Sequence, residues 1–154
     1  MLGRVLTQEF MLIGEHEHRI DAKRRLSLPA KMRRVFGGVV ILTRGLDRCL
    51  FIYAKDEWAG KSRALAVHSE GNADSRQYVR SRLSGAEEVE IDALGRILVP
   101  ERLTTYAALS TGVTIIGVGN HAEIWDTEKW KAYRDEMESR TDELAERMGG
   151  MNTS

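Results

Sequence analysis

The sequence predicts a mainly β fold with helices, of the α+β class, in which one small unit occurs twice. Two observations support this prediction. The segment that begins at Gly14 matches the segment that begins at Gly85, at an offset of 71 residues, and both copies alternate short β-rich runs with turns and brief helices. The only two prolines of the chain, Pro29 and Pro100, occupy equivalent positions. Chance is a poor explanation for this agreement, so we infer an internal duplication.

Each copy opens with an Asp-x-x-x-Arg frame, followed by an apolar run and a proline. The two frames are Asp21 to Arg25 and Asp92 to Arg96. In the second copy, residues 88–91 alternate polar and apolar side chains, Gly95 suits a tight turn, and residues 96–99 resume a β-rich run. We therefore expect a strand, a turn and a second strand at the start of each copy.

A short helix is expected after each frame, because a proline fits the first turn of a helix, where its missing N–H costs nothing. These helices should cover residues 29–36 and the segment from Pro100 to Gly112. Runs of β-branched and aromatic residues then predict further strands. They lie at residues 39–42, 49–53, 113–116 and 123–125.

Three more helices are predicted, at residues 56–67, at residues 75–83, and from Asp126 or Thr127 to about Met148. The last helix spaces large apolar side chains along one face. They are Trp130, Tyr133, Met137, Leu144 and Met148. Packing of this face against the chain's own sheet is favoured over a role in partner binding alone, because Trp130 repeats the position of Trp58. Subunit contacts through this helix stay open.

The pattern divides the chain into five parts. They are an N-terminal extension (1–10), a first repeat (11–60), a helical connection (61–84), a second repeat (85–130), and a C-terminal helix with a flexible tail (131–154). Two repeats are too few for a solenoid, so the halves should pack on each other. Interlocked halves would also protect the edges of such short strands.

The charges are balanced in total but unevenly distributed. Lysine plus arginine and aspartate plus glutamate each number 23. Bases outnumber acids seven to three between Gly14 and Arg34, whereas residues 123–148 hold nine acids and five bases. A nucleic-acid site would therefore be local, since the chain as a whole lacks a basic excess. No signal peptide or membrane span is recognisable, so we expect a cytoplasmic protein with no membrane partner.

Residues that could support catalysis or metal binding do not form a recognisable motif. Cys49, the only cysteine, lies in an apolar run and is expected to be a buried thiol. His16 and His18 alternate along one strand without the further ligands that zinc requires, and the other two histidines, His68 and His121, are isolated in sequence. We expect no enzyme activity, no cofactor, no metal and no small-molecule substrate.

Four segments resemble the MraZ family of bacterial transcriptional regulators. They are GEHEHRIDAK at 14–23, RLSLPAK at 25–31, LTRGLDRCL at 42–50 and SGAEEVEID at 84–92. The match runs from about Met11 to about Tyr133. It is specific because both Asp-x-x-x-Arg frames are followed by an apolar strand and a proline.

The resemblance implies two AbrB-like swapped-hairpin units that form one interlocked double-split β-barrel with peripheral helices. It also implies a nucleoid-associated regulator, a repressor in our reading, of the division and cell wall gene cluster and of its own promoter. Such a protein would bind direct repeats in double-stranded DNA as a closed ring of identical subunits. A ring-forming structural or protein-interaction module without specific DNA binding is the alternative.

The chain departs from the family pattern in two places. Lys23-Arg24-Arg25 stands where the family usually has Lys-Gly-Arg, so the first turn lacks the glycine that the second turn keeps at Gly95. We expect this turn to be strained or differently shaped. Residues 1–10 precede the usual family start near Met11.

The predicted DNA-binding residues lie in the first repeat. Arg25 or Lys23 could read bases, because a guanidinium fork matches guanine, and Arg24 adds a phosphate contact. The cations expected to hold the DNA backbone are Arg19, Lys31, Arg33 and Arg34. A structural role is expected for Asp21, Asp92, Gly95, Arg96, Pro29 and Pro100, although symmetry would also allow Arg96 to touch DNA. The second repeat is expected to serve mainly assembly, and a solvated charged surface is the competing interpretation of the basic cluster.

Overall fold

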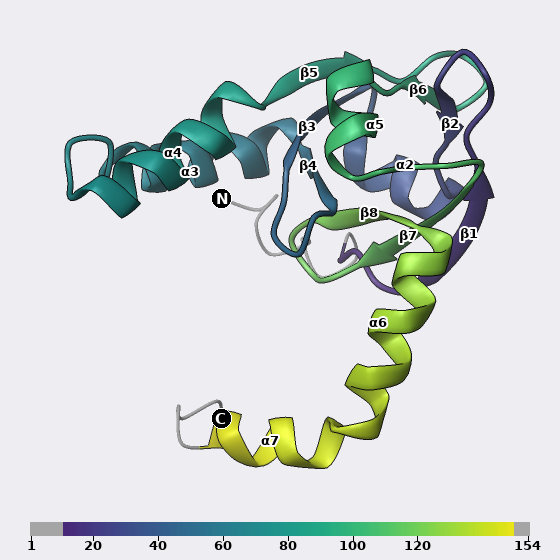
Figure 1. Ribbon diagram of the computed structural model, residues 1–154. Coiled ribbons are helices and arrows are strands. Elements are labelled where there is room, and N and C mark those ends of the chain that lie inside the picture. The colour runs from purple at the N-terminus through teal and green to yellow at the C-terminus, as the bar shows by residue number, and fades with distance from the viewer. Residues whose placement is uncertain (1–10, 150–154) are drawn as a thin grey trace.

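The computed structural model describes residues 11–149 and shows an α+β fold made of two sheets with helices around them (Figure 1). The strands are β1 (Glu15–Arg19), β2 (Arg25–Ser27), β3 (Val39–Arg44), β4 (Leu50–Ala54), β5 (Glu87–Glu90), β6 (Arg96–Leu98), β7 (Gly112–Gly117) and β8 (Ala122–Asp126). The helices are α2 (Ala30–Phe36), α3 (Lys55–Ala66), α4 (Ala73–Ser84), α5 (Glu101–Tyr106), α6 (Thr127–Ser139) and α7 (Thr141–Gly149). The predicted extension, residues 1–10, and the last residues of the predicted tail, 150–154, lie outside the described residues.

The two copies exchange their first strands. A six-stranded antiparallel sheet has the order β1-β7-β8-β4-β3-β5, so β1 of the first copy pairs with β7 of the second, and β5 pairs with β3. The two pairings have the same register. His16 and Glu87 occupy equivalent positions in β1 and β5, and they lie opposite Ile115 and Leu42, which are equivalent in β7 and β3. β2 and β6 form a separate two-stranded ribbon. The duplicated α+β fold is thus confirmed, while closure into a barrel stays a prediction.

The main hydrophobic core joins the six-stranded sheet to the ribbon. Leu26 of β2 and Ile97 of β6 are almost fully buried, and they pack in one cluster with apolar residues of the sheet, of α2 and of α5. Burial of side chains of this size contributes about 1.5 to 3 kcal/mol each. The ribbon is therefore fixed to the sheet through one of its faces, and its other face remains available to solvent.

The six-stranded sheet is apolar on both faces. Because successive side chains along a strand point to opposite sides, Leu50 and Ile52 enter the main core while Phe51 and Tyr53 enter a second cluster. Arg82 of α4 reaches this second cluster and is only 2% exposed. Its guanidinium donates a hydrogen bond to the hydroxyl of Tyr53 on β4 (2.8 Å), which holds α4 against the sheet, and a second to the hydroxyl of Tyr78 on α4 itself (2.7 Å).

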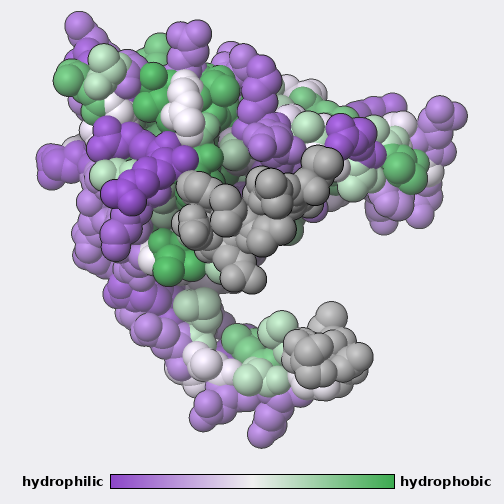
Figure 2. All heavy atoms as spheres, turned by 180° about the vertical axis from the view of Figure 1, so that it is seen from behind, coloured by the Kyte–Doolittle hydropathy of each residue, from purple (hydrophilic) through white to green (hydrophobic). Residues whose placement is uncertain are grey.

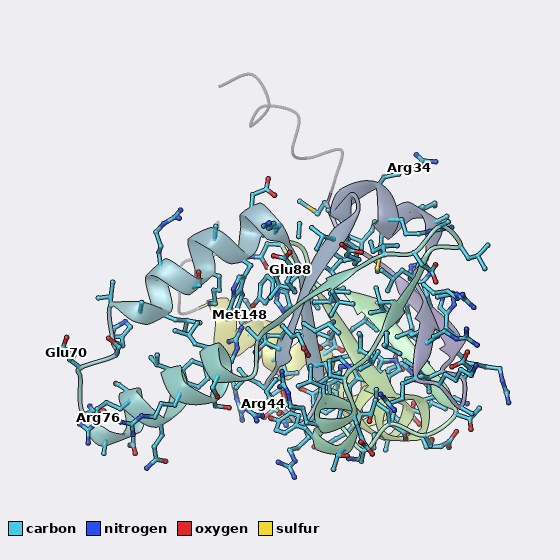
Figure 3. All side chains as sticks on the ribbon, turned by 90° about the horizontal axis from the view of Figure 1, so that it is seen from above. Arg34, Arg44, Glu70, Arg76, Glu88 and Met148 are labelled. Atoms are coloured by element: carbon cyan, nitrogen blue, oxygen red, sulfur yellow. The ribbon has the colours of Figure 1, made fainter. Side chains whose placement is uncertain are left out.

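α3 and α4 form a helical hairpin that projects from the body of the protein (Figure 1). Glu70 and Arg76 lie at the far end of this hairpin, whereas Arg34 of α2 lies on the opposite side of the molecule (Figure 3). The predicted helices at residues 56–67 and 75–83 correspond to these two elements.

The proline-led helices differ in detail from their prediction. Pro29 and Pro100 both stand immediately before the helix, at the N-cap position, and not within the first turn. The helix expected to reach Gly112 ends at Tyr106. Ala108, two residues later, has φ = 50°, and this left-handed conformation is incompatible with a continuing helix.

The single C-terminal helix expected from the sequence is two helices, α6 and α7, separated at Arg140, where φ is −120° and ψ is 11°. The Thr141 hydroxyl donates to the carbonyl of Met137 at 3.2 Å, an alternative backbone contact that favours a helix boundary. Trp130 of α6 is buried, as predicted, but no residue of α7 is. Hydrophobic side chains of α7, among them Met148 at 54% exposure, lie at the surface (Figure 2).

His121, in the turn between β7 and β8, is a neutral base inside the second cluster. Its ring stacks on that of Tyr53 with a centroid distance of 5.0 Å. Burial, and then the charge of Arg82, lower the pKa of His121 from 6.5 to about 4. The Glu123 carboxylate lies 3.9 Å from Nε2 and would favour protonation, but burial and Arg82 outweigh it.

We expect His121 to lower the free energy of unfolding by about 3 kcal/mol when the pH falls from 7 to 4. The unfolded chain takes up this proton near pH 6.5, whereas the folded chain takes it up only near pH 4, so this part of the stability is complete above pH 6.5 and is lost below it. Urea unfolding at both pH values should show a smaller pH dependence in His121→Gln and an unchanged one in His68→Gln. An unchanged pH dependence in His121→Gln would contradict the assignment.

Candidate nucleic-acid interface

The two Asp-x-x-x-Arg frames form matching turns. The Asp21 carboxylate accepts hydrogen bonds from the backbone N–H of Lys23 and of Arg25, each at 2.9 Å, and from Nε of Arg25 at 2.7 Å. Asp92 does the same for the backbone of Leu94 and Arg96, and for Nε of Arg96 at 2.9 Å. An aspartate that opens a turn in this way fixes both the backbone and the arginine side chain. The predicted pairing of each aspartate with the arginine four residues later is therefore present.

These hydrogen bonds also keep the two carboxylates charged. The backbone N–H of Arg25 is the largest cause of a lowered pKa at Asp21, and the backbone N–H of Arg96 has the same effect at Asp92. Both groups lie at the surface. Each turn thus presents an ionised carboxylate that orients a neighbouring guanidinium group.

The ribbon brings Arg25 and Arg96 onto one surface. In its antiparallel register Arg25 lies opposite Leu98, and Ser27 lies opposite Arg96. Opposed residues point to the same side of a ribbon, and so do residues two apart along a strand. We call this solvent-facing side, formed by Arg25, Ser27, Arg96 and Leu98, the ribbon face.

The ribbon face bears on one expectation from the sequence. The assignment of DNA contact to the first repeat and of assembly mainly to the second stays a prediction, but Arg96 of the second repeat shares a surface with Arg25. The duplication could have indicated this equivalence, since both frames have the same spacing. The register that places Ser27 and Leu98 between the two arginines could not be read from the sequence, because it arises from pairing between distant segments.

Each arginine of the ribbon face is held and yet available. Nε of Arg25 is engaged by Asp21, and Nε of Arg96 by Asp92, while the terminal nitrogens make no hydrogen bond with any residue in the range 11–149. The Arg25 side chain is 37% exposed and that of Arg96 is 28% exposed. A guanidinium fork oriented by a carboxylate suits bidentate contact with a planar acceptor such as a guanine edge.

The other predicted cations surround this face unevenly. Lys23 in the first turn, and Lys31 and Arg34 on α2, are exposed. Arg33 is half-buried, because its guanidinium covers Gly95 in the second turn; a Cβ atom built on Gly95 would lie 2.6 Å from Cζ of Arg33. Arg33 is therefore placed to hold that turn, and is less available to DNA than the sequence suggested.

The missing glycine of the first turn has a visible consequence. Arg24 adopts φ = 64°, the left-handed conformation that Gly95 adopts at φ = 82° in the second turn. Nε of Arg24 donates to the carbonyl of Val99 at 3.1 Å, which ties the first turn to the end of β6. The predicted strain is thus present at Arg24, together with one contact that offsets part of its cost.

We expect Arg24→Gly to change the free energy of unfolding by less than about 1 kcal/mol. Relief of the left-handed backbone gains about 1 to 2 kcal/mol. Loss of the hydrogen bond to Val99 and the greater freedom of glycine when unfolded together cost a similar amount. Urea denaturation measures the difference, and a loss above about 2 kcal/mol would show that the Arg24 side chain matters more to folding than this balance allows.

The residues considered for catalysis or metal binding do not gather near the ribbon. Cys49 is fully buried, and burial raises the pKa of its thiol. His18 on β1 has a pKa lowered by burial and by the charge of His16. Within residues 11–149, no group of three or more histidine, cysteine, aspartate or glutamate side chains is placed to hold a metal ion.

Among the helices of residues 11–149, none is long and apolar enough to span a lipid bilayer.

Sequence comparisons match the chain to one family twice. A family model described as "MraZ protein, putative antitoxin-like" matches residues 11–81 and again residues 83–151. The transcriptional regulator MraZ of Alkaliphilus metalliredigens is 44% identical over 138 residues, which make up 90% of this chain and 96% of that relative. The proteins of the same name from Ligilactobacillus salivarius and Acetivibrio thermocellus are 44% and 42% identical, with the same coverage.

Proposed function

The chain belongs to the MraZ family, and from this premise we propose that it is a transcriptional regulator that contacts double-stranded DNA through its ribbon face. The observation that carries the proposal is the placement of Arg25 and Arg96 on one exposed surface, each oriented by an aspartate. A two-stranded antiparallel ribbon is narrow enough to enter the major groove, where base edges differ between base pairs.

The surrounding cations would position the ribbon rather than read sequence. Lys23 is exposed in the first turn, whereas Lys31 and Arg34 are exposed on α2, the helix whose Arg33 covers the second turn. All three would neutralise phosphates. Each neutralised phosphate releases counterions, so binding should weaken steeply with added salt. This arrangement explains how a chain with no net charge binds DNA through one local surface.

We further propose that subunits assemble into a closed ring that binds direct repeats. The support is the apolar surface of α7, where Leu144 is half-buried and Met148 is exposed within the described chain. A head-to-tail ring presents the same face in one rotational sense, which suits direct repeats, whereas a two-fold dimer suits a palindrome. Occupying several repeats at once raises affinity through effective concentration.

We infer from the family that the protein acts in the cytoplasm at the nucleoid, and that it represses the division and cell wall gene cluster together with its own promoter. The predicted division into two repeats, with a connection at residues 61–84, is part of this proposal.

The test is binding of the purified protein to its own upstream DNA. A fragment with direct repeats should bind better than a shuffled fragment of equal length, and the preference should persist at moderate salt. Equal affinity for both fragments would favour a structural or protein-interaction role instead. Native mass spectrometry should show one closed oligomer, and a monomer at working concentration would refute the ring.

A further inference from the structure

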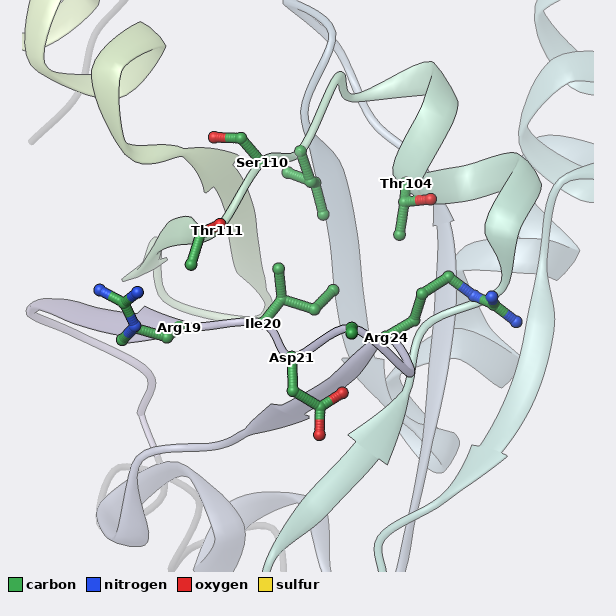
Figure 4. A pocket seen from close by; sticks show the side chains of 9 residues that line it. Arg19, Ile20, Asp21, Arg24, Thr104, Ser110 and Thr111 are labelled. Carbon is green, nitrogen blue, oxygen red and sulfur yellow. The ribbon is translucent and has the colours of Figure 1, made fainter.

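The first turn borders an open groove of about 540 Å³, which lies between that turn and the segment joining α5 to β7 (Figure 4). Arg19 and Arg24 stand at its two ends, with Thr104, Ser110 and Thr111 along one side (Figure 4). We call it the Arg19–Arg24 groove. Asp21 belongs both to its lining and to the turn that orients Arg25, so the groove continues directly from the ribbon face.

Two guanidinium groups at the groove have N–H donors that make no hydrogen bond with the described part of the protein. The terminal nitrogens of Arg24, and the whole guanidinium of Arg19, make no hydrogen bond or ion pair within residues 11–149. The one carboxylate in the lining, that of Asp21, is already engaged by the first turn. The hydroxyls of Thr104 and Ser110 donate inside the protein, so the donors left for a ligand are the two guanidinium groups and the Thr111 hydroxyl.

Because the fold is duplicated, the groove at the first end of the ribbon can be compared with the equivalent region at the second end. The equivalence of the two ends is set by one backbone contact, since Ile20 N–H donates to the Thr111 carbonyl and Ile91 N–H donates to the Gly38 carbonyl, each at 2.9 Å. The second end lacks the features of the first. Glu90 replaces Arg19, Gly95 replaces Arg24, and Gly37 and Gly38 replace Ser110 and Thr111.

The two ends of the ribbon therefore share a backbone but differ in charge. Arg33 of α2 lies at the second end and covers Gly95, the residue that stands where Arg24 stands at the first end. Each end keeps the aspartate of its own turn, but the first end presents two free guanidinium groups where the second presents the exposed carboxylate of Glu90 and a glycine.

We propose that the Arg19–Arg24 groove binds two phosphates of the DNA backbone, one at each arginine, beside the bases that the ribbon contacts, and that it fixes the direction in which each subunit lies along DNA. The proposal rests on the DNA-binding function proposed above. Guanidinium groups bind phosphate oxygens in charge-assisted pairs, and such contacts set register and orientation. Without the groove, a ribbon with near two-fold symmetry would accept DNA in either direction. With it, repeated subunits in a ring require repeats that all point the same way.

The test uses the full-length protein and a duplex carrying one copy of the repeat that the wild type selects from random DNA. The variant Arg19→Gln/Arg24→Gly removes both cations, and its second change restores the residue type present in the other turn. The control variant Arg63→Gln/Arg80→Gln removes two exposed arginines of α3 and α4. The two variants therefore lose the same charge from different parts of the surface.

Two measurements decide the outcome. The slope of log affinity against log salt should fall by about 2 in the groove variant, with affinity at least about tenfold weaker, and neither should change in the control. Phosphate ethylation should block wild-type binding at phosphates on one side of the repeat only, and this one-sided interference should disappear in the groove variant. Ethylation of the phosphates next to the ribbon, at the centre of the repeat, should still block binding of the groove variant.

An unchanged salt slope with one-sided interference retained in the groove variant would overturn the groove assignment while leaving the proposed function intact. A wild type that selects no repeat would instead overturn both. Titration of inorganic phosphate into the wild type without DNA separates the two sources of phosphate. We expect no saturable binding at micromolar concentrations, and such binding would identify free phosphate as the ligand and overturn the proposal.

Discussion

Replacing both Arg25 and Arg96 with glutamine is expected to weaken binding to direct-repeat DNA by about 100-fold or more. A bidentate arginine contact with guanine contributes about 1 to 3 kcal/mol of discrimination, and the ribbon face holds two such side chains. Glutamine keeps hydrogen-bonding capacity but loses the charge and the fork. The measurement is a titration of repeat and shuffled DNA at one fixed salt concentration, which separates lost specificity from lost electrostatic attraction.

The two single variants measure how much each repeat contributes to DNA affinity. Arg25→Gln and Arg96→Gln should each lose part of the affinity, because both arginines lie on the ribbon face. Loss confined to Arg25→Gln would restore the view that the first repeat alone contacts DNA. If the double variant binds repeat DNA within about threefold of the wild type, the ribbon face is not the interface.

Folding of these variants should be nearly unchanged. The ion pairs that they break lie at the surface, with side-chain exposures of 37% and 41% for Arg25 and Asp21 and of 28% and 42% for Arg96 and Asp92. Exposed pairs contribute about 1 kcal/mol or less to stability. Arg63→Gln is the charge-matched control for the single variants and Arg63→Gln/Arg80→Gln for the double variant, since both arginines are exposed on the α3–α4 hairpin, away from the ribbon. Circular dichroism and urea unfolding confirm that a loss of binding does not reflect a loss of structure.

Gly117→Ala is expected to lower the free energy of unfolding by more than about 3 kcal/mol, the largest effect of any change to stability considered for this chain. Gly117 ends β7, and its N–H donates to the carbonyl of Gly14 at 2.9 Å. A Cβ atom at this position would lie 2.6 Å from Cα of Ile13, and closer still to the backbone of Leu12 and to the Ile13 nitrogen. Backbone atoms cannot rotate away as side chains do, so the segment must shift.

The shift would break the contacts that hold the segment before β1. Leu12 is 2% exposed and belongs to the main core, and it exchanges two backbone hydrogen bonds with Gly119, at 3.0 and 2.8 Å. Urea unfolding of Gly117→Ala measures the loss. A change below about 1 kcal/mol would mean that the close approach of Ile13 to β7 does not occur in solution.

Gly60→Ala is the matched control for Gly117→Ala, and its expected effect on stability has the opposite sign. Gly60 lies within α3, it is exposed, and a Cβ atom there would meet nothing within 4 Å. Alanine is the better helix former, so this change should stabilise the protein by about 0.5 to 1 kcal/mol. The pair of variants separates steric contact from the general effect of replacing glycine.

Local patterns determined the parts of the fold that depend on neighbours in sequence. The duplication was visible because the frames at Asp21 and Asp92 recur with the same spacing and the same proline. The turns followed from the chemistry of aspartate and glycine, and the strands from their β-branched and apolar runs. The MraZ resemblance followed from these same residues, and the comparisons confirmed it.

The boundaries of the C-terminal helices show where such patterns fail. Apolar residues keep helical spacing across Arg140, so periodicity alone predicts one helix through the break between α6 and α7. A backbone boundary at Arg140 depends on where the chain leaves the surface of the sheet. That position is set by packing, so the helical spacing of apolar residues does not predict it.

By itself, then, the sequence determined that this protein is a duplicated α+β chain with two Asp-x-x-x-Arg turns and a basic first repeat. Only the tertiary structure decided which strands pair, and hence that Arg25 and Arg96 share one face. It also decided that Arg33 covers one turn while the Arg19–Arg24 groove lies open beside the other. The physical reason is that strand pairing joins residues about seventy positions apart, and no local preference specifies a partner at that distance.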